Sequence, residues 1–118
     1  MILAIAKEGK YVSSHFGHCE GFEMVEVDGG RVLNRTAVAN PGHRPGFLPE
    51  FLADKGVKAV ISGGMGASAQ ALFNSKGIDV FTGVQGDLDS VIESYVKGEL
   101  EFSDSVCHDH HYEGECHS

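Results

Sequence analysis

The sequence predicts one α/β domain, in which helices cover the faces of a single mixed five-stranded sheet. Short apolar or alternating runs are separated by glycine-rich turns from segments with helical spacing. Their order along the chain is strand, β-hairpin, helix, strand, helix, strand, helix, which indicates three antiparallel strands followed by α/β units. A chain of 118 residues can bury one core of this kind without disulfides.

The first third of the chain predicts the antiparallel strands. Residues 2–6 form an apolar run typical of a buried strand, and residues 22–27 alternate between apolar and polar. Asp28-Gly29 is a two-residue hairpin signal, so residues 31–39 return beside the second strand. Residues 8–21 form the long loop between the first two strands.

The rest of the domain predicts helices that alternate with strands. Apolar residues recur at helical spacing in segments 47–52, 65–73 and 88–96, and Asp87 is a suitable N-cap for the last. A glycine ends each helix, at Gly56, Gly77 and Gly98. The β-branched runs 57–61 and 78–81 predict buried strands, and the first of them should lie parallel to the initial strand.

Composition limits the function. The formal net charge of −8 argues against a nucleic-acid binder, which would carry a basic face. The first apolar run is too short to span a membrane and no basic residue precedes it, so a cytoplasmic protein is expected. Apolar residues become sparse from Glu99, which predicts a domain over residues 1–102 and a flexible Cys/His-rich tail over residues 103–118.

The segment SSHFGHCEG carries the first candidate site. His15, His18 and Cys19 offer borderline to soft ligands, which suit Zn, Cu, Fe or an iron–sulfur cluster. The same spacing also fits a solvated histidine, a histidine at the sheet edge and a buried cysteine, so spacing alone does not decide between binding and structure.

A glycine-rich turn, SGGMG, follows the predicted strand 57–61. Gly63, Gly64, Met65 and Gly66 enter a helix, so backbone N–H groups could hold an anion there. Neither a Walker A loop nor a GxGxxG motif is present, and the glycines could instead serve close strand–helix packing. His43, in NPGHRPG, could face the same cleft or solvent.

The end of the chain holds a second cluster of metal-ligand residue types. Six such residues occur within the last twelve: Cys107, His108, His110, His111, Cys116 and His117. The spacing matches no standard zinc finger, but a native tail that binds Zn, Ni or Cu fits it. The alternatives are an expression tag, a tail that takes up adventitious metal, and a Cys107–Cys116 disulfide.

Recognised catalytic arrangements are not evident. Ser13 and Ser14 are sequence neighbours of His15, whereas triad partners normally converge from separate segments. Cys19 beside His18 has no evident oxyanion hole or orienting carboxylate. A non-enzyme is therefore expected.

Taken together, these motifs resemble a known family. HFG after the first strand, NPGH followed by PGFLPEFLADKGV, and VISGGMGASAQALFNSKGIDVFTGVQG are similar to the dinitrogenase iron–molybdenum cofactor biosynthesis family, the NifX- and NafY-like domains also found fused to NifB. The resemblance covers nearly all of residues 1–102. It implies an RNase H-like fold with a five-stranded mixed sheet.

The resemblance also implies a function. It implies non-catalytic binding, carriage or assembly of an iron–sulfur or molybdenum-containing cluster, with cluster-assembly proteins as partners. A related group, the orange proteins, holds a molybdenum–copper sulfide cluster. A ligand histidine in the loop after the first strand corresponds here to His15 or His18. The alternative from the residues themselves is a Zn, Ni or Cu module, or an interaction protein that uses the tail.

Overall fold

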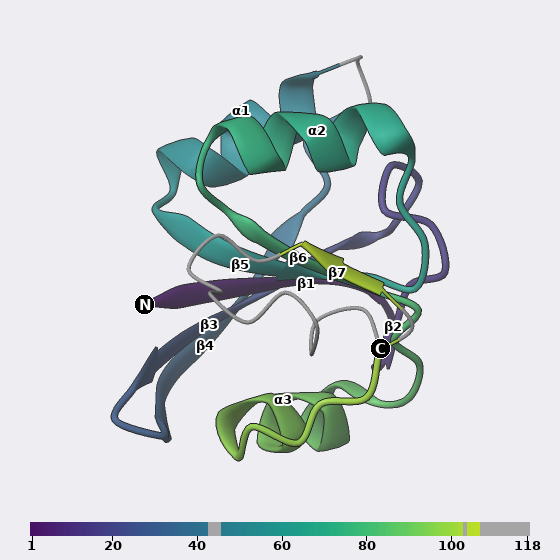
Figure 1. The fold of residues 1–118 in the computed structure, drawn as a ribbon. Helices are drawn as coiled ribbons and strands as arrows, with labels where there is room; N and C mark the ends of the chain where they lie inside the picture. Colours follow the sequence, from purple (N-terminus) through teal and green to yellow (C-terminus); the bar gives the residue numbers. More distant parts are fainter. Residues whose placement is uncertain (43–45, 103, 107–118) are drawn as a thin grey trace.

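The computed structural model describes residues 1–42, 46–102 and 104–106. These residues form seven strands and three helices on two sides of one sheet (Figure 1). In chain order they are β1 (Ile2–Glu8), β2 (Tyr11–Val12), β3 (Gly21–Asp28), β4 (Arg31–Ala39), α1 (Phe47–Asp54), β5 (Val57–Ile61), α2 (Ala67–Ser75), β6 (Asp79–Thr82), α3 (Leu88–Val96) and β7 (Asp104–Val106).

The sheet confirms the predicted mixed architecture. Its order is β4-β3-β1-β5-β6-β7, with β2 paired to β1 outside this path. β3 is antiparallel to both β1 and β4, whereas β5 is parallel to β1 and to β6. The antiparallel arrangement of β1, β3 and β4 and the parallel pairing of β5 with β1 are therefore as predicted. The RNase H-like classification stays a prediction.

Two details of the predicted sheet were wrong. The described residues add two short strands, β2 and β7, to the five expected, because segments of two and three residues show no readable periodicity. The hairpin turn is Gly29-Gly30 rather than Asp28-Gly29. Both of its central residues have positive φ, 58° and 76°, and glycine adopts such angles without a steric penalty.

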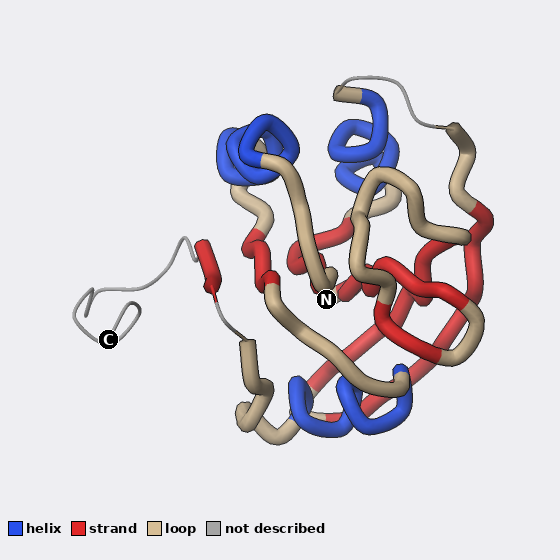
Figure 2. Tube along the Cα trace, turned by 90° about the vertical axis from the view of Figure 1, so that its right-hand side faces the viewer, coloured by secondary structure: helices blue, strands red, loops and turns tan. Residues whose placement is uncertain are grey.

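Helices cover both faces of the sheet, with α1 and α2 on one side and α3 on the other (Figure 2). Along β1, Ala4 and Ala6 face the first pair of helices, and Leu3 and Ile5 face α3. This two-sided burial explains the uninterrupted apolar run of β1. No helix in the described part of the chain is long and apolar enough to cross a membrane.

The buried apolar residues form two core clusters, one on each face of the sheet. The α1/α2 cluster contains Ala4, Ala6, Phe16, Cys19, Phe22, Leu48, Leu52, Val57, Val60, Phe73, Ile78 and Val80. The α3 cluster contains Leu3, Ile5, Val25, Val27, Ala59, Ile61, Val84, Leu88, Val91 and Ile92.

The predicted helix ends are also confirmed. The carboxylate of Asp87 accepts a hydrogen bond of 2.9 Å from the backbone N–H of Ser90, so it caps α3. Gly56, Gly77 and Gly98 each follow a helix with φ between 74° and 83°. Pro49 lies in the first turn of α1, where its missing N–H costs nothing.

Three loops meet at one edge of the sheet. β1, β5 and β6 are parallel, so their carboxyl ends lie at the same edge, and residues 9–20, 62–66 and 83–87 follow them. Ligands of open α/β sheets bind most often at this edge. The histidine loop and the glycine-rich turn are therefore both in the expected position for a binding site.

Candidate functional site

The histidine loop, residues 13–20, presents its side chains in two directions. His15 and His18 are exposed, whereas Phe16 and Cys19 are each only 4% exposed. The Phe16 ring packs at 5.6 Å from Phe22 and at 5.4 Å from Phe73, measured between ring centroids. Phe16 and Cys19 thus anchor the loop in the α1/α2 cluster, and both imidazoles stay on the outside.

Backbone hydrogen bonds join this loop to the glycine-rich turn. Gly63 N–H donates to Ser13 O at 2.8 Å, and Phe16 N–H donates to Gly64 O at 3.0 Å. In Figure 1 the loop, in purple, lies beside the chain that enters α2. Two segments fifty residues apart in the sequence therefore form one surface.

Close backbone approach explains two of the glycines. A Cβ atom on Gly63 would lie 2.8 Å from Ser13 O and 2.9 Å from Ser14 Cα, and one on Gly64 would lie 2.7 Å from Ser14 O. These distances are shorter than van der Waals contact. Gly63 and Gly64 are therefore required by packing of the turn against the histidine loop, rather than by strand–helix packing.

The remaining residues of the turn lead into α2. Gly66 is the N-cap of α2, and no side chain caps this end. The first backbone N–H groups of the helix therefore form a positive end suited to an anion. Met65 is half-buried against the α1/α2 cluster, and its carbonyl accepts a 2.9 Å hydrogen bond from the Gln70 side chain.

Asn40, which follows β4, holds the histidine loop in place through hydrogen bonds. Its Nδ2 donates to Cys19 O at 2.9 Å and to Gly17 O at 3.4 Å. Its backbone N–H donates to Glu20 O at 3.1 Å, and its Oδ1 accepts from Gly42 N–H at 3.0 Å. Sequence reasoning missed Asn40, because an asparagine in an NPG segment is typical of any turn.

The Cys19 thiol lies within reach of the same asparagine. The Nδ2 of Asn40 is 3.8 Å from the Cys19 sulfur. Burial is the main cause that raises the pKa of this thiol, from 9.0 to about 11. Cys19 is thus protonated at neutral pH, whereas the thiolate is the form that binds metals.

The predicted ligands do not form a complete metal-ion site within the described ranges. No group of three or more His, Cys, Asp or Glu side chains converges there in a geometry that could hold a metal ion. His43 and the tail residues Cys107, His108, His110, His111, Cys116 and His117 lie outside the described residues. The segment that leads to His43 does contact the histidine loop, through Asn40, whose side chain also accepts a hydrogen bond from Gly42 N–H.

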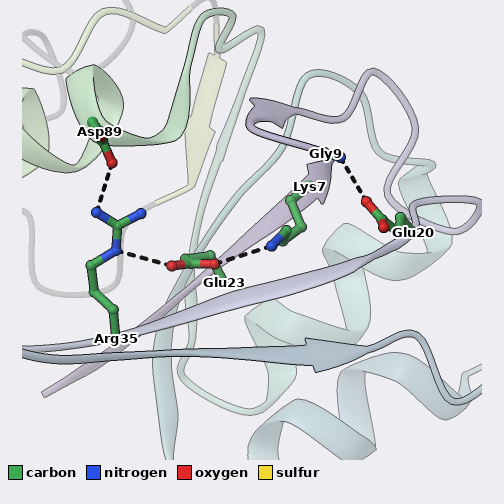
Figure 3. A network of polar contacts seen from close by, with 6 residues as sticks. All are labelled: Lys7, Gly9, Glu20, Glu23, Arg35 and Asp89. Atoms are coloured by element: carbon green, nitrogen blue, oxygen red, sulfur yellow. Dashed lines mark hydrogen bonds and ion pairs between the residues drawn. The ribbon is translucent and has the colours of Figure 1, made fainter.

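A second polar cluster lies on the α3 face of the sheet (Figure 3). Glu23 accepts from Lys7 Nζ at 3.3 Å and from Arg35 Nε at 2.9 Å, and Arg35 Nη1 donates to Asp89 at 2.7 Å. Sequence reasoning did not select these residues. A signal was present, since Glu23 shares one face of its strand with Val25 and Val27, and all three are buried.

Comparison with known proteins identifies the family. A family model described as "Dinitrogenase iron-molybdenum cofactor" matches residues 1–98. The chain belongs to this family. Protein MJ0580 of Methanocaldococcus jannaschii is 31% identical to it over 106 residues, which cover 86% of this chain and 90% of that protein.

Solved structures share the fold of this member of the dinitrogenase iron-molybdenum cofactor family. The crystal structure of PH0822 aligns with a TM-score of 0.81 and 39% sequence identity, over 86% of this chain and 94% of that one. The apo form of the orange protein from Desulfovibrio gigas aligns with a TM-score of 0.72 at 21% identity, over 86% and 91% of the two chains. The second similarity shows a shared fold. Membership of the family indicates a role related to this cofactor.

Proposed function

We propose that the protein binds an iron–sulfur or molybdenum-containing cluster and carries it, or helps to assemble it, without catalysing a reaction. The observation that supports this most strongly is the exposed pair of imidazoles on the histidine loop. His15 and His18 project outward from a loop that Phe16, Cys19 and Asn40 hold in place. The loop lies at the carboxyl edge of the parallel strands, where ligands are expected.

The chemistry of the surrounding surface suits this cargo. Imidazole nitrogens bind Fe, Cu and Zn. The uncapped start of α2, at Gly66, provides backbone N–H groups that would favour an anionic cluster locally, although the whole chain carries a net charge of −8. We assign Gly64, Met65 and Gly66 to the cluster-binding surface. Gly63 serves the packing of the turn against the histidine loop.

Two imidazoles do not saturate a cluster, so further ligands are needed. Cys19 would join only after its thiol loses a proton and becomes accessible. His43 would be another ligand, since it follows in sequence the segment that Asn40 holds beside the loop. The tail residues from Cys107 to His117 would deliver Zn, Ni, Cu or the cluster's own metals, and cluster-assembly proteins would be the partners for transfer. A shared ligand set of this kind suits a carrier, which must release its cargo.

The test is anaerobic cluster reconstitution followed by metal analysis and visible absorption. The variants are His15→Ala, His18→Ala and Cys19→Ser, with a chain truncated after Phe102 to separate the tail from the domain. His15→Ala and His18→Ala should each weaken cluster retention, and the truncated chain should retain bound cluster. Retention at the wild-type level in both histidine variants would reject the loop as the site. Loss of all metal with the tail would favour the simple metal-binding module.

A further inference from the structure

A pocket on the α3 face has no role in the function proposed above. It has a volume of about 390 Å³, within the range of ligand pockets, roughly 300–1,000 Å³. Its walls come from the carboxyl end of β1, residues 9–11, β3, β4 and the first turn of α3. It opens at the same edge of the sheet as the histidine loop, but on the opposite face.

The carboxylates around this pocket already have partners. Glu23, whose side chain is 10% exposed, is held between Lys7 and Arg35 (Figure 3). Asp89 accepts from Arg35, and Asp87 caps α3 through Ser90. Each of these carboxylates therefore already has a cation or a backbone N–H group of α3 beside it.

The cations of the pocket keep unused donors, and one of them, Lys10, has no carboxylate partner among the described residues. Lys10 lines the pocket and makes no ion pair or side-chain hydrogen bond with the described part of the chain. Toward the described residues, Lys7 uses one donor, to Glu23, and Arg35 uses Nε and Nη1 but not Nη2. An ammonium or guanidinium with free N–H groups is a strong donor to carboxylate or phosphate oxygens.

The pocket also has an aromatic wall and a fixed backbone. Tyr11 is 62% exposed although it is a large ring, and it lines the opening. Leu88 N–H donates to Lys10 O at 2.8 Å, and Val12 N–H donates to Gly86 O at 3.0 Å. Gly9 N–H donates to the Glu20 carboxylate at 2.6 Å. These bonds hold Lys10 and Tyr11 against the start of α3, so the pocket is formed before a ligand arrives.

We infer that this pocket binds a small organic anion. Its carboxylate or phosphate group pairs with Lys10, Lys7 and Arg35, and its planar body lies against Tyr11. Binding here is independent of cluster binding, because the two sites lie on opposite faces of the sheet. A protein that carries cargo on one face would thereby carry a second, metal-free ligand on the other.

The test is a titration of the full chain with phenyl phosphate, followed by backbone amide chemical shifts, with inorganic phosphate as the comparison ligand. Saturable shifts are expected at residues 10–11 and 87–89, with tighter binding of phenyl phosphate than of inorganic phosphate. Lys10→Ala should weaken binding about tenfold or more, since it removes a charge-assisted contact. Lys10 is exposed and makes no ion pair or side-chain hydrogen bond with the described residues, so this variant should fold normally.

The matched control is Lys58→Ala, which removes the same charge from an exposed lysine outside the pocket and should leave binding unchanged. The absence of saturable shifts, shifts confined to other residues, or equal weakening by Lys58→Ala would each overturn the proposal. Equal affinity for the two ligands would overturn the role of Tyr11 and the organic nature of the ligand.

Discussion

Gly63→Ala tests whether the glycine-rich turn is shaped by its contact with the histidine loop. The new methyl carbon would lie 2.8 Å from Ser13 O and 2.9 Å from Ser14 Cα, both of them backbone atoms that cannot rotate away. Overpacking of this kind costs about 1–3 kcal/mol. The loss of glycine freedom in the unfolded chain returns about 0.4–1 kcal/mol. A net decrease of about 1–2 kcal/mol in the free energy of unfolding is expected.

The matched control is Gly66→Ala, three residues further along. Nothing lies within 4 Å of a Cβ atom at Gly66, and its φ of −67° suits any residue. The gain in the unfolded state and the weaker N-cap nearly cancel, so a change within about 0.5 kcal/mol is expected. Urea unfolding of both variants measures the difference. Equal stability of Gly63→Ala and Gly66→Ala would refute the packing argument.

Three further predictions concern Cys19, Glu23 and Asn40. Burial raises the pKa of Cys19 from 9.0 to about 11, so the folded state favours the neutral thiol over the thiolate. The stability that the neutral thiol contributes should be complete below pH 9 and should decline by up to about 3 kcal/mol toward pH 11. Urea titrations should show this decline in the wild type but not in Cys19→Ala, and the same decline in both would contradict it. Glu23→Gln should lower the free energy of unfolding by about 2 kcal/mol, since it leaves Lys7 and Arg35 without their buried carboxylate partner. Glu93→Gln, which removes an exposed ion pair, should cause no measurable change. Equal effects of the two substitutions would contradict the role of burial. Asn40→Ala should speed amide hydrogen exchange at Phe16 and Glu20, whose N–H groups donate to Gly64 O and Lys7 O, because it removes two hydrogen bonds that hold the loop between them. Unchanged protection of these amides would show that Asn40 does not hold the loop.

The sequence was sufficient to predict the main strands and the three helices. Strands such as β1 and β5 are apolar runs bounded by turns, and α3 combines an amphipathic pattern with an N-cap at Asp87. These features depend only on residues within one segment, so the sequence of that segment is enough to predict them. β2 and β7 have only two and three residues, too few to show a pattern, and β7 also depends on pairing with the distant strand β6.

The candidate site was only partly predictable for the same reason. The soft-ligand content of SSHFGHCEG indicated a site, but the direction of each side chain depends on the core beneath it. Phe16 and Cys19 point inward because Phe22 and Phe73 complete that core, and this places His15 outside. The contact of Gly63 with Ser13 joins segments fifty residues apart, which a single sequence does not reveal.

The most direct test of the central claim is a metal inventory of the protein purified anaerobically from its native source, compared with the His15→Ala/His18→Ala double variant prepared in the same way. We predict iron, molybdenum or both, together with sulfide, in the wild type and a clear loss of these elements in the double variant. Phe16 and Cys19 anchor the loop in the core, and urea unfolding of the double variant establishes that it is folded before its metal content is compared. A folded double variant with the full wild-type metal and sulfide content would contradict the assignment of the histidine loop as the cluster-binding site.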